Sequence, residues 1–97
     1  MFACVLVVDL FVPAAHSLKE KRAAITPILE GARRRHRVSV SEVAHQDLWQ
    51  RSELAFATVA SSETNAREVI DAVERFVWSF PEVEVTAARR SWLEEEN

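Results

Sequence analysis

Glycine and cysteine are almost missing from this sequence of 97 residues, which contains one of each. A lone glycine, Gly31, excludes the glycine-rich P-loops and GxGxxG turns whose backbone amides cradle nucleotide phosphates. A lone cysteine excludes internal disulfides and suits a reducing compartment. Because Cys4 lies within an apolar run, we interpret it as a small core residue. These absences favour a cytoplasmic protein without nucleotide cofactors.

Long hydrophobic runs are also lacking. The first apolar stretch, residues 2–12, contains Asp9 and is shorter than the roughly 20 residues that a membrane span needs. It has neither the basic start nor the cleavage site of a signal peptide. With 48% hydrophobic and 28% charged residues, the chain has the composition and length of one globular domain over residues 1–97. We expect no membrane partner.

The hydrophobic periodicity predicts six elements in the order βαββαβ. The expected strands cover residues 2–12, 37–45, 50–60 and 82–90, the expected helices cover 17–36 and 66–80, and the last residues fray. Right-handed crossovers around both helices would give a four-stranded antiparallel sheet in the order 4-1-3-2, with both helices on one face. The predicted fold is therefore an α+β, ferredoxin-like sandwich.

Local signals refine the first helix. Ser17 and Glu20 have the S-x-x-E spacing of a capping box, in which the serine accepts from the Glu20 amide and Glu20 reaches back to the Ser17 amide. Pro27 lies inside the helical pattern and cannot donate a hydrogen bond to a preceding carbonyl. We therefore expect a kink at residues 23–27 or a helix that restarts with Thr26 as its cap.

Two of the strands carry further information. In the second strand Val43 is out of phase with Val40, which predicts a bulge or a strand end near residues 41–42. The first strand is apolar on both faces, and its second face includes Val5, Val7 and Phe11. A second copy of the chain that covers this face would explain the pattern. Long side chains on the neighbouring strands would explain it as well.

Charge is distributed unevenly along the chain, whose net charge is −3. The first 51 residues are net basic and the remainder is net acidic. The basic side chains gather at the two ends of the first helix, as a basic helix edge roughly 25 Å long by helical rise. Its members are Lys19, Lys21, Arg22, Arg33, Arg34, Arg35 and Arg37. Such an edge can neutralise several RNA phosphates, although a solvated face with arginines favoured by the helix dipole is the simpler interpretation.

The segment between the second and third strands is the densest group of polar functional side chains. Its members are His45, Gln46, Asp47, Trp49, Gln50 and Arg51. His45 and Asp47 could form an acid–base pair, but no nucleophile lies near them in the sequence. A structural role, with Asp47 satisfying turn amides and Trp49 covering the sheet, explains the segment too. The three histidines lack ligand spacing, so no metal site is expected.

Two stretches, LFVPAAHSLKEKR at residues 10–22 and VSVSEVAHQDLWQR at residues 38–51, resemble the YlxP-like family of small bacterial proteins of unknown function. The similarity in pattern extends over nearly the whole chain. The resemblance implies a ferredoxin-like fold, bacterial origin and a gene neighbourhood of translation and ribosome-maturation factors. Pro27 departs from the helix that the resemblance implies.

The leading hypothesis is a noncatalytic accessory protein that contacts RNA or a ribosomal particle through the basic helix edge. The alternative is a homodimer or protein-binding module that uses the open sheet face, and the two are compatible. An enzyme centred on His45 and Asp47 would need a deep pocket beside their segment. We expect no cofactor, no catalytic residue and no DNA specificity. Base stacking on the sheet is disfavoured, because the stretches VLVVDL and ELAFATV of the first and third strands contain only Phe56 among the aromatics that such a site needs.

Overall fold

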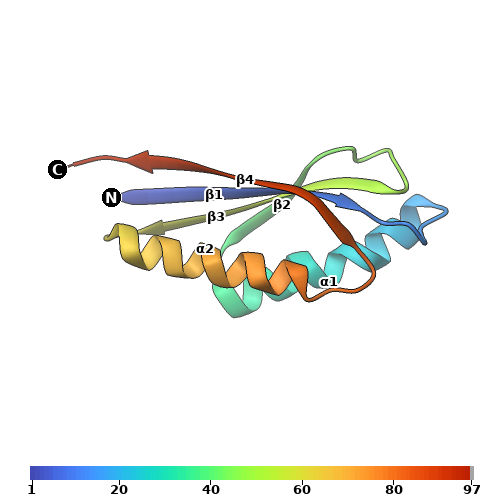
Figure 1. The fold of residues 1–97 in the computed structure, drawn as a ribbon, viewed down its shortest axis with the longest axis horizontal. Coiled ribbons are helices and arrows are strands. Elements are labelled where there is room, and N and C mark those ends of the chain that lie inside the picture. Colours follow the sequence, from blue (N-terminus) through green and yellow to red (C-terminus); the bar gives the residue numbers. More distant parts are fainter. Residues whose placement is uncertain (97) are drawn as a thin grey trace.

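A computed structural model of the protein describes residues 1–96. Figure 1 shows a sheet with two helices packed along one side of it. The elements in chain order are β1 (Phe2–Phe11), α1 (Leu18–His36), β2 (Ser39–Ala44), β3 (Arg51–Ala60), α2 (Glu63–Trp78) and β4 (Glu84–Glu94). The predicted βαββαβ order is confirmed.

The four strands form one sheet in the order β2-β3-β1-β4. All neighbouring pairs are antiparallel, and β1 pairs with β3 on one side and with β4 on the other. Both helices lie below the sheet in Figure 1, and no helix covers its upper face. The predicted ferredoxin-like sandwich is thus confirmed, with β1 as a central strand and one sheet face left open.

The core lies between the sheet and the helices. Alternate residues of β1 point into it and are fully buried, and the prediction that Cys4 is a core residue is confirmed. From β3, Leu54 and Phe56 meet them, and α2 contributes Ile70 and Val73 at helical spacing. Because strand residues alternate between faces, this burial fixes which side chains of β1 and β3 remain on the open face.

The first helix begins as predicted but continues past its proline. The Ser17 hydroxyl accepts from the Glu20 amide at 3.1 Å, whereas the Glu20 carboxylate accepts from the amide of His16, not from that of Ser17. The expectation of a restart at Thr26 is wrong, because α1 is one continuous helix with Pro27 inside it. Pro27 and Ala23 are both exposed, so water can reach the carbonyl that the proline leaves without a donor.

The strands also differ in detail from the sequence-based expectation. The register of β2 against β3 shifts between Glu42 and Ala44, which confirms the predicted bulge. The last strand is longer than predicted, because β1 offers partners as far as Glu94, which pairs with Phe2. Met1 and Glu95 then exchange backbone hydrogen bonds. The expectation that the chain frays after residue 91 is therefore wrong for the described residues, and Asn97 lies outside them.

The single glycine allows α1 and α2 to approach closely. A Cβ atom at Gly31 would lie 2.4 Å from Cζ of Phe76 on α2. Phe76 in turn makes edge-to-face contacts with His36 and Phe80, with ring centroids 5.5 and 5.0 Å apart. Because Gly31 has no side chain, this aromatic cluster can pack between the C-terminal half of α1 and the end of α2.

The contact between Gly31 and Phe76 predicts that one substitution has opposite effects on the free energy of unfolding in the presence and absence of the Phe76 ring. Gly31→Ala should gain up to about 1 kcal/mol of helix propensity, but in the parent protein the added methyl group displaces Phe76. We therefore expect Gly31→Ala to lower the free energy of unfolding in the parent and to raise it when Phe76 is already alanine. Urea denaturation of the four variants measures both effects, and equal effects in the two backgrounds would contradict the packing role.

Candidate nucleic-acid interface and the β2–β3 loop

Most basic side chains of α1 lack an acidic partner. The described cations that form ion pairs are Lys21, Arg33, Arg67, Arg89 and Arg90. The cations that pair with no described carboxylate are Lys19, Arg22, Arg34, Arg35, Arg37, Arg51 and Arg75. All but the last two belong to α1 or to its C-cap, and all are exposed. Unpaired positive charge is therefore concentrated on one helix.

The exposed cations of α1 and its C-cap, which include the paired Arg33, form two groups. Lys19 and Arg22 lie near the start of α1, and the arginine cluster, which we define as Arg33, Arg34, Arg35 and Arg37, lies at its end. Ala23, Thr26 and Pro27 separate the groups, and Glu30 pairs with Arg33. Arg37 caps the helix in the left-handed region with φ 54°. The basic helix edge is thus divided, and its strongest part is the C-terminal cluster.

Lys21 does not belong to that edge. Its side chain is fully buried, and its Nζ lies 2.9 Å from a Glu42 carboxylate oxygen. The same Nζ donates to the carbonyls of His45, Gln46 and Arg51 at 2.8, 3.2 and 3.3 Å. A buried ammonium with these partners cannot reach a phosphate, so the expectation of RNA contact through Lys21 is wrong.

The sequence contained a signal for this burial. Lys21 lies four residues before Ile25 and seven before Ile28, which places it on the same helical face as these core residues. A lysine on an apolar face is buried only when it is paired. The partner could not be identified from the sequence, because β2 and its following loop lie far along the chain.

Lys21 holds the backbone of the β2–β3 loop, and two glutamine side chains extend this support. Gln50 donates to the Pro13 carbonyl at 3.1 Å and Gln46 to the Glu42 carbonyl at 3.4 Å. His45 has a positive φ of 64°, a conformation that is uncommon for a residue other than glycine. Three members of the polar segment therefore have structural positions in the loop.

The tip of the loop faces the solvent. Leu48 is 46% exposed and Trp49 is 54% exposed, so about half of each side chain is open to solvent. Among the described hydrogen bonds, none has the Asp47 carboxylate as acceptor. Asp47 to Arg51 line a hollow of about 400 Å³. A rigid base thus presents two apolar side chains at the surface.

Among the described residues, the side chains considered for catalysis or metal binding are not brought together. No hydrogen bond joins His45 to Asp47 there, and His45 does not line the hollow beside it. Burial raises the pKa of the Cys4 thiol, and a protonated thiol is a poor nucleophile. Within residues 1–96, no three His, Cys, Asp or Glu side chains lie close enough to hold a metal ion. None of the helices described there has the length and apolar character to cross a membrane.

The open sheet face divides the residues predicted for self-association. Around Val5, an apolar patch comprises Ala3, Val5, Ala57, Val59 and Leu93, as the strand register sets them side by side. Val59 and Leu93 are 70% and 59% exposed. Val7 lies next to an ion pair at 3.0 Å between Arg89 of β4 and Glu53 of β3. Phe11 lies at the opposite end of β1 and does not join the patch.

The buried ion pair predicts a large cost for one substitution. Lys21→Met leaves the Glu42 carboxylate without its cation and three backbone carbonyls without this donor, so we expect a loss of about 3–5 kcal/mol in the free energy of unfolding. Lys19→Met, two residues away and exposed, is the matched control and should change it by less than about 1 kcal/mol. Urea denaturation followed by circular dichroism measures both. Equal stability of the two variants would contradict the anchoring role of Lys21.

Comparison with solved structures identifies the fold only. The de novo designed protein Foldit4 matches with a TM-score of 0.56 and 11% identity, over 99% of this chain and 100% of that chain. The de novo designed protein LFR1 1, which has a ferredoxin fold, matches with a TM-score of 0.52 and 14% identity, over 100% of this chain and 89% of that chain. Both similarities support the ferredoxin-like architecture.

Comparison of sequences identifies the family. The uncharacterized protein YlxP of Bacillus subtilis (strain 168) is 42% identical over 79 residues, which are 81% of this chain and 86% of that protein. The model of the family described as "Protein of unknown function (DUF503)" matches residues 3–90, which include every strand and helix at least in part. The chain therefore belongs to the DUF503 family, whose function is unknown.

Proposed function

We propose that this protein is a noncatalytic accessory protein of the bacterial cytoplasm that contacts RNA or a ribosomal particle through α1. The observation that carries the proposal is the group of exposed cations on α1 and its C-cap that pair with no described carboxylate. Arg34, Arg35 and Arg37 contribute most, because they are adjacent. Lys19 and Arg22 add a second contact near the start of the helix.

The charge distribution favours this role over a solvated helix face. A protein of net charge −3 has enough carboxylates to neutralise its surface arginines, and three of the five arginines outside α1 and its C-cap form ion pairs. Arg67 pairs with Glu63, and Arg90 pairs with Asp71 and Glu74. The helix dipole favours cations at the last turn of a helix, but it does not account for Lys19 and Arg22 near the start of α1. Among the described residues, only Lys21 and Arg33 of α1 have an acidic partner, so five exposed cations of α1 and its C-cap remain unpaired.

The resemblance to the YlxP-like family supports the proposed RNA contact, because it implies that the neighbouring genes encode translation and ribosome-maturation factors. Contacts between arginine and phosphate are strong and do not depend on the base sequence of the RNA. A surface of this kind would bind structured RNA through its backbone. Within residues 1–96, the middle of the open sheet face carries no aromatic side chain, which agrees with binding through the RNA backbone.

Salt dependence tests the proposal. Binding to RNA should weaken as the salt concentration rises, so the slope of log K against log salt is negative. The magnitude of this slope should decrease by roughly 2 when three phosphate contacts are lost. We expect this for the triple variant Arg34→Gln, Arg35→Gln, Arg37→Gln. The matched control, Arg67→Gln, Arg75→Gln, Arg89→Gln, removes the same charge elsewhere and should leave the slope near that of the parent. Fluorescence anisotropy with a structured RNA measures it.

Two outcomes would refute the proposal. One is that the parent protein does not associate with structured RNA or with ribosomal subunits at low salt. The other is that both triple variants weaken binding equally, which would mean that total charge and not the position on α1 determines the affinity. Circular dichroism of each variant checks that folding is unchanged.

A second role, self-association through the open sheet face, is favoured by the apolar patch around Val5. Two of its side chains are more than half exposed, and soluble monomers rarely leave neighbouring apolar side chains uncovered. The ion pair between Arg89 and Glu53 supplies long side chains beside Val7, so this half of β1 needs no partner. Self-association would therefore involve the end of the sheet that contains Val59 and Leu93.

Light scattering tests this role. The parent should form a dimer, and Val59→Lys should produce a monomer, because it places a charge in the patch at a site too exposed to affect folding. Thr26→Lys adds the same charge on the outer surface of α1 and should leave the dimer intact. A parent protein that stays monomeric at high concentration would exclude this role.

A further inference from the structure

The arginine cluster adjoins a hollow with aromatic walls. This hollow, of about 630 Å³, is lined by Pro27, Glu30, Gly31, Arg34, Arg35, Phe76, Ser79 and Phe80. Its volume lies within the range of small-molecule sites, roughly 300–1,000 Å³. It occupies the seam between the second half of α1 and the end of α2. The unpaired cations and the exposed aromatic surface of the helical layer therefore meet at one place.

The aromatic side chains of the hollow are held in place. Phe76 is fixed against Gly31, whose lack of a side chain makes room for the ring. Phe80 stands edge-to-face to Phe76 with ring centroids 5.0 Å apart and an interplanar angle of 84°. The backbone of Phe80 is tied into the connection from α2 to β4 by hydrogen bonds to Val77 and Val83. Neither ring is fully buried, so aromatic surface remains accessible.

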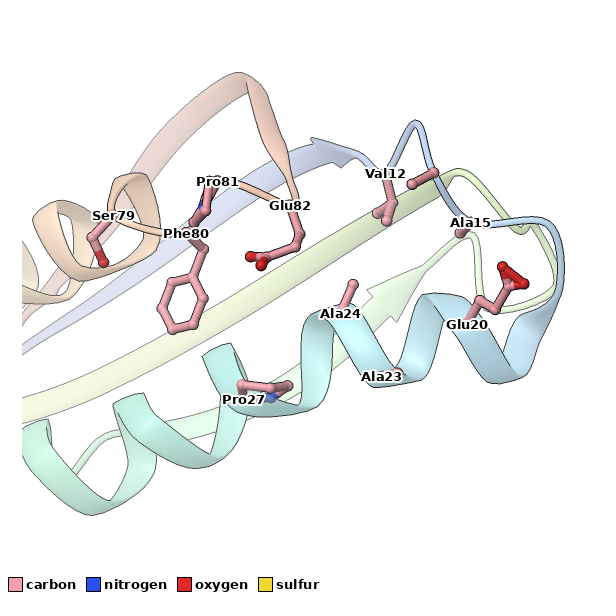
Figure 2. Close-up of a pocket in the computed structure, with 11 residues that line it drawn as sticks. Val12, Ala15, Glu20, Ala23, Ala24, Pro27, Ser79, Phe80, Pro81 and Glu82 are labelled. Atoms are coloured by element: carbon pink, nitrogen blue, oxygen red, sulfur yellow. The ribbon is translucent and has the colours of Figure 1, made fainter.

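Phe80 also borders a second hollow. This space, of about 620 Å³, extends from Phe80 and Pro27 toward the start of α1. Figure 2 shows the Phe80 ring projecting from the α2–β4 connection toward Pro27, with Ala23 and Ala24 further along the helix. The walls are mainly alanine, proline and valine, with Glu20 and Glu82 as the acidic residues. A flat ring that stacks on Phe80 thus has apolar space beside it.

Charge distinguishes the two sides of Phe80. On one side Arg34 and Arg35 have no described acidic partner, and the Arg35 guanidinium lies 5.6 Å from the centre of the Phe76 ring. Glu30 also lines that side, but it is paired with Arg33. On the other side the wall is mainly apolar, and its two carboxylates, Glu20 and Glu82, disfavour an anion there. A ligand that matches this arrangement has a flat aromatic part and an attached anion.

We infer that the seam between α1 and α2 binds a single unpaired nucleotide of RNA. The base stacks on Phe80, and the neighbouring phosphates contact Arg34 and Arg35. Stacking on aromatic rings combined with basic contacts to the backbone is how proteins hold single strands without reading their sequence. This inference rests on the proposed RNA contact, and it adds that the preferred RNA has a looped-out or single-stranded nucleotide, not a continuous duplex.

A base-stacking signal separates this inference from plain phosphate binding. The probe is a short single-stranded RNA with one 2-aminopurine, whose fluorescence changes on stacking, and its affinity is measured by anisotropy. Phe80→Leu should reduce affinity roughly 5- to 150-fold and abolish the fluorescence change, while the salt slope remains that of the parent. Phe80→Tyr keeps the ring and should bind like the parent, which controls for folding. Trp78→Leu removes an exposed aromatic outside the hollow and should have no effect.

The comparison of ligands completes the test. A strand of equal length without bases carries the same charge, and the parent should bind it as weakly as Phe80→Leu binds the intact strand. Equal binding of the strands with and without bases, or an unchanged affinity of Phe80→Leu, would overturn the nucleotide site and leave the proposed RNA contact standing. Failure of the parent to bind any of these RNAs would refute both.

Discussion

The buried ammonium of Lys21 is the contact on which the shape of one end of the molecule depends. It joins the first turns of α1 to Glu42 on β2 and to the carbonyls of the loop that follows. Ser52 of β3 donates to the same Glu42 carboxylate at 2.6 Å. One charge pair thus links α1, β2 and β3. Because an unpaired buried charge is costly, this ion pair favours the observed position of the two ends of the loop that displays Leu48 and Trp49.

The two faces of the same helix differ in the side chains they carry. Its inner face carries core residues together with Lys21, and its outer face carries cations without acidic partners. At its C-terminal end the lone glycine admits Phe76, which places aromatic rings next to Arg34 and Arg35. Packing between α1 and α2 therefore determines where the positive charge meets aromatic surface. In this account, fold stability and RNA contact depend on the same helix but on different residues.

The fold could be predicted because its signals are periodic and local. Alternation in the strands, the phase break at Val43 and the serine before α1 each identify a feature that the structure confirms. The errors have long-range causes. Lys21 was predicted to be exposed, because its partners lie on β2 and the loop, far along the chain. The predicted β4 ended too early, because the local sequence does not show that this strand pairs with the start of β1. The aromatic hollow also escaped prediction, since it forms only when α1 and α2 pack together.

We propose that RNA contacts this protein through the unpaired cations of α1. Chemical-shift mapping by NMR tests it most directly, because it reports every backbone amide as RNA is added. We expect shifts at Arg34, Arg35, Arg37 and the neighbouring end of α2, with smaller shifts near Lys19 and Arg22 and none on the open sheet face. Shifts confined to the sheet face or to the β2–β3 loop, or no shifts at low salt, would contradict it.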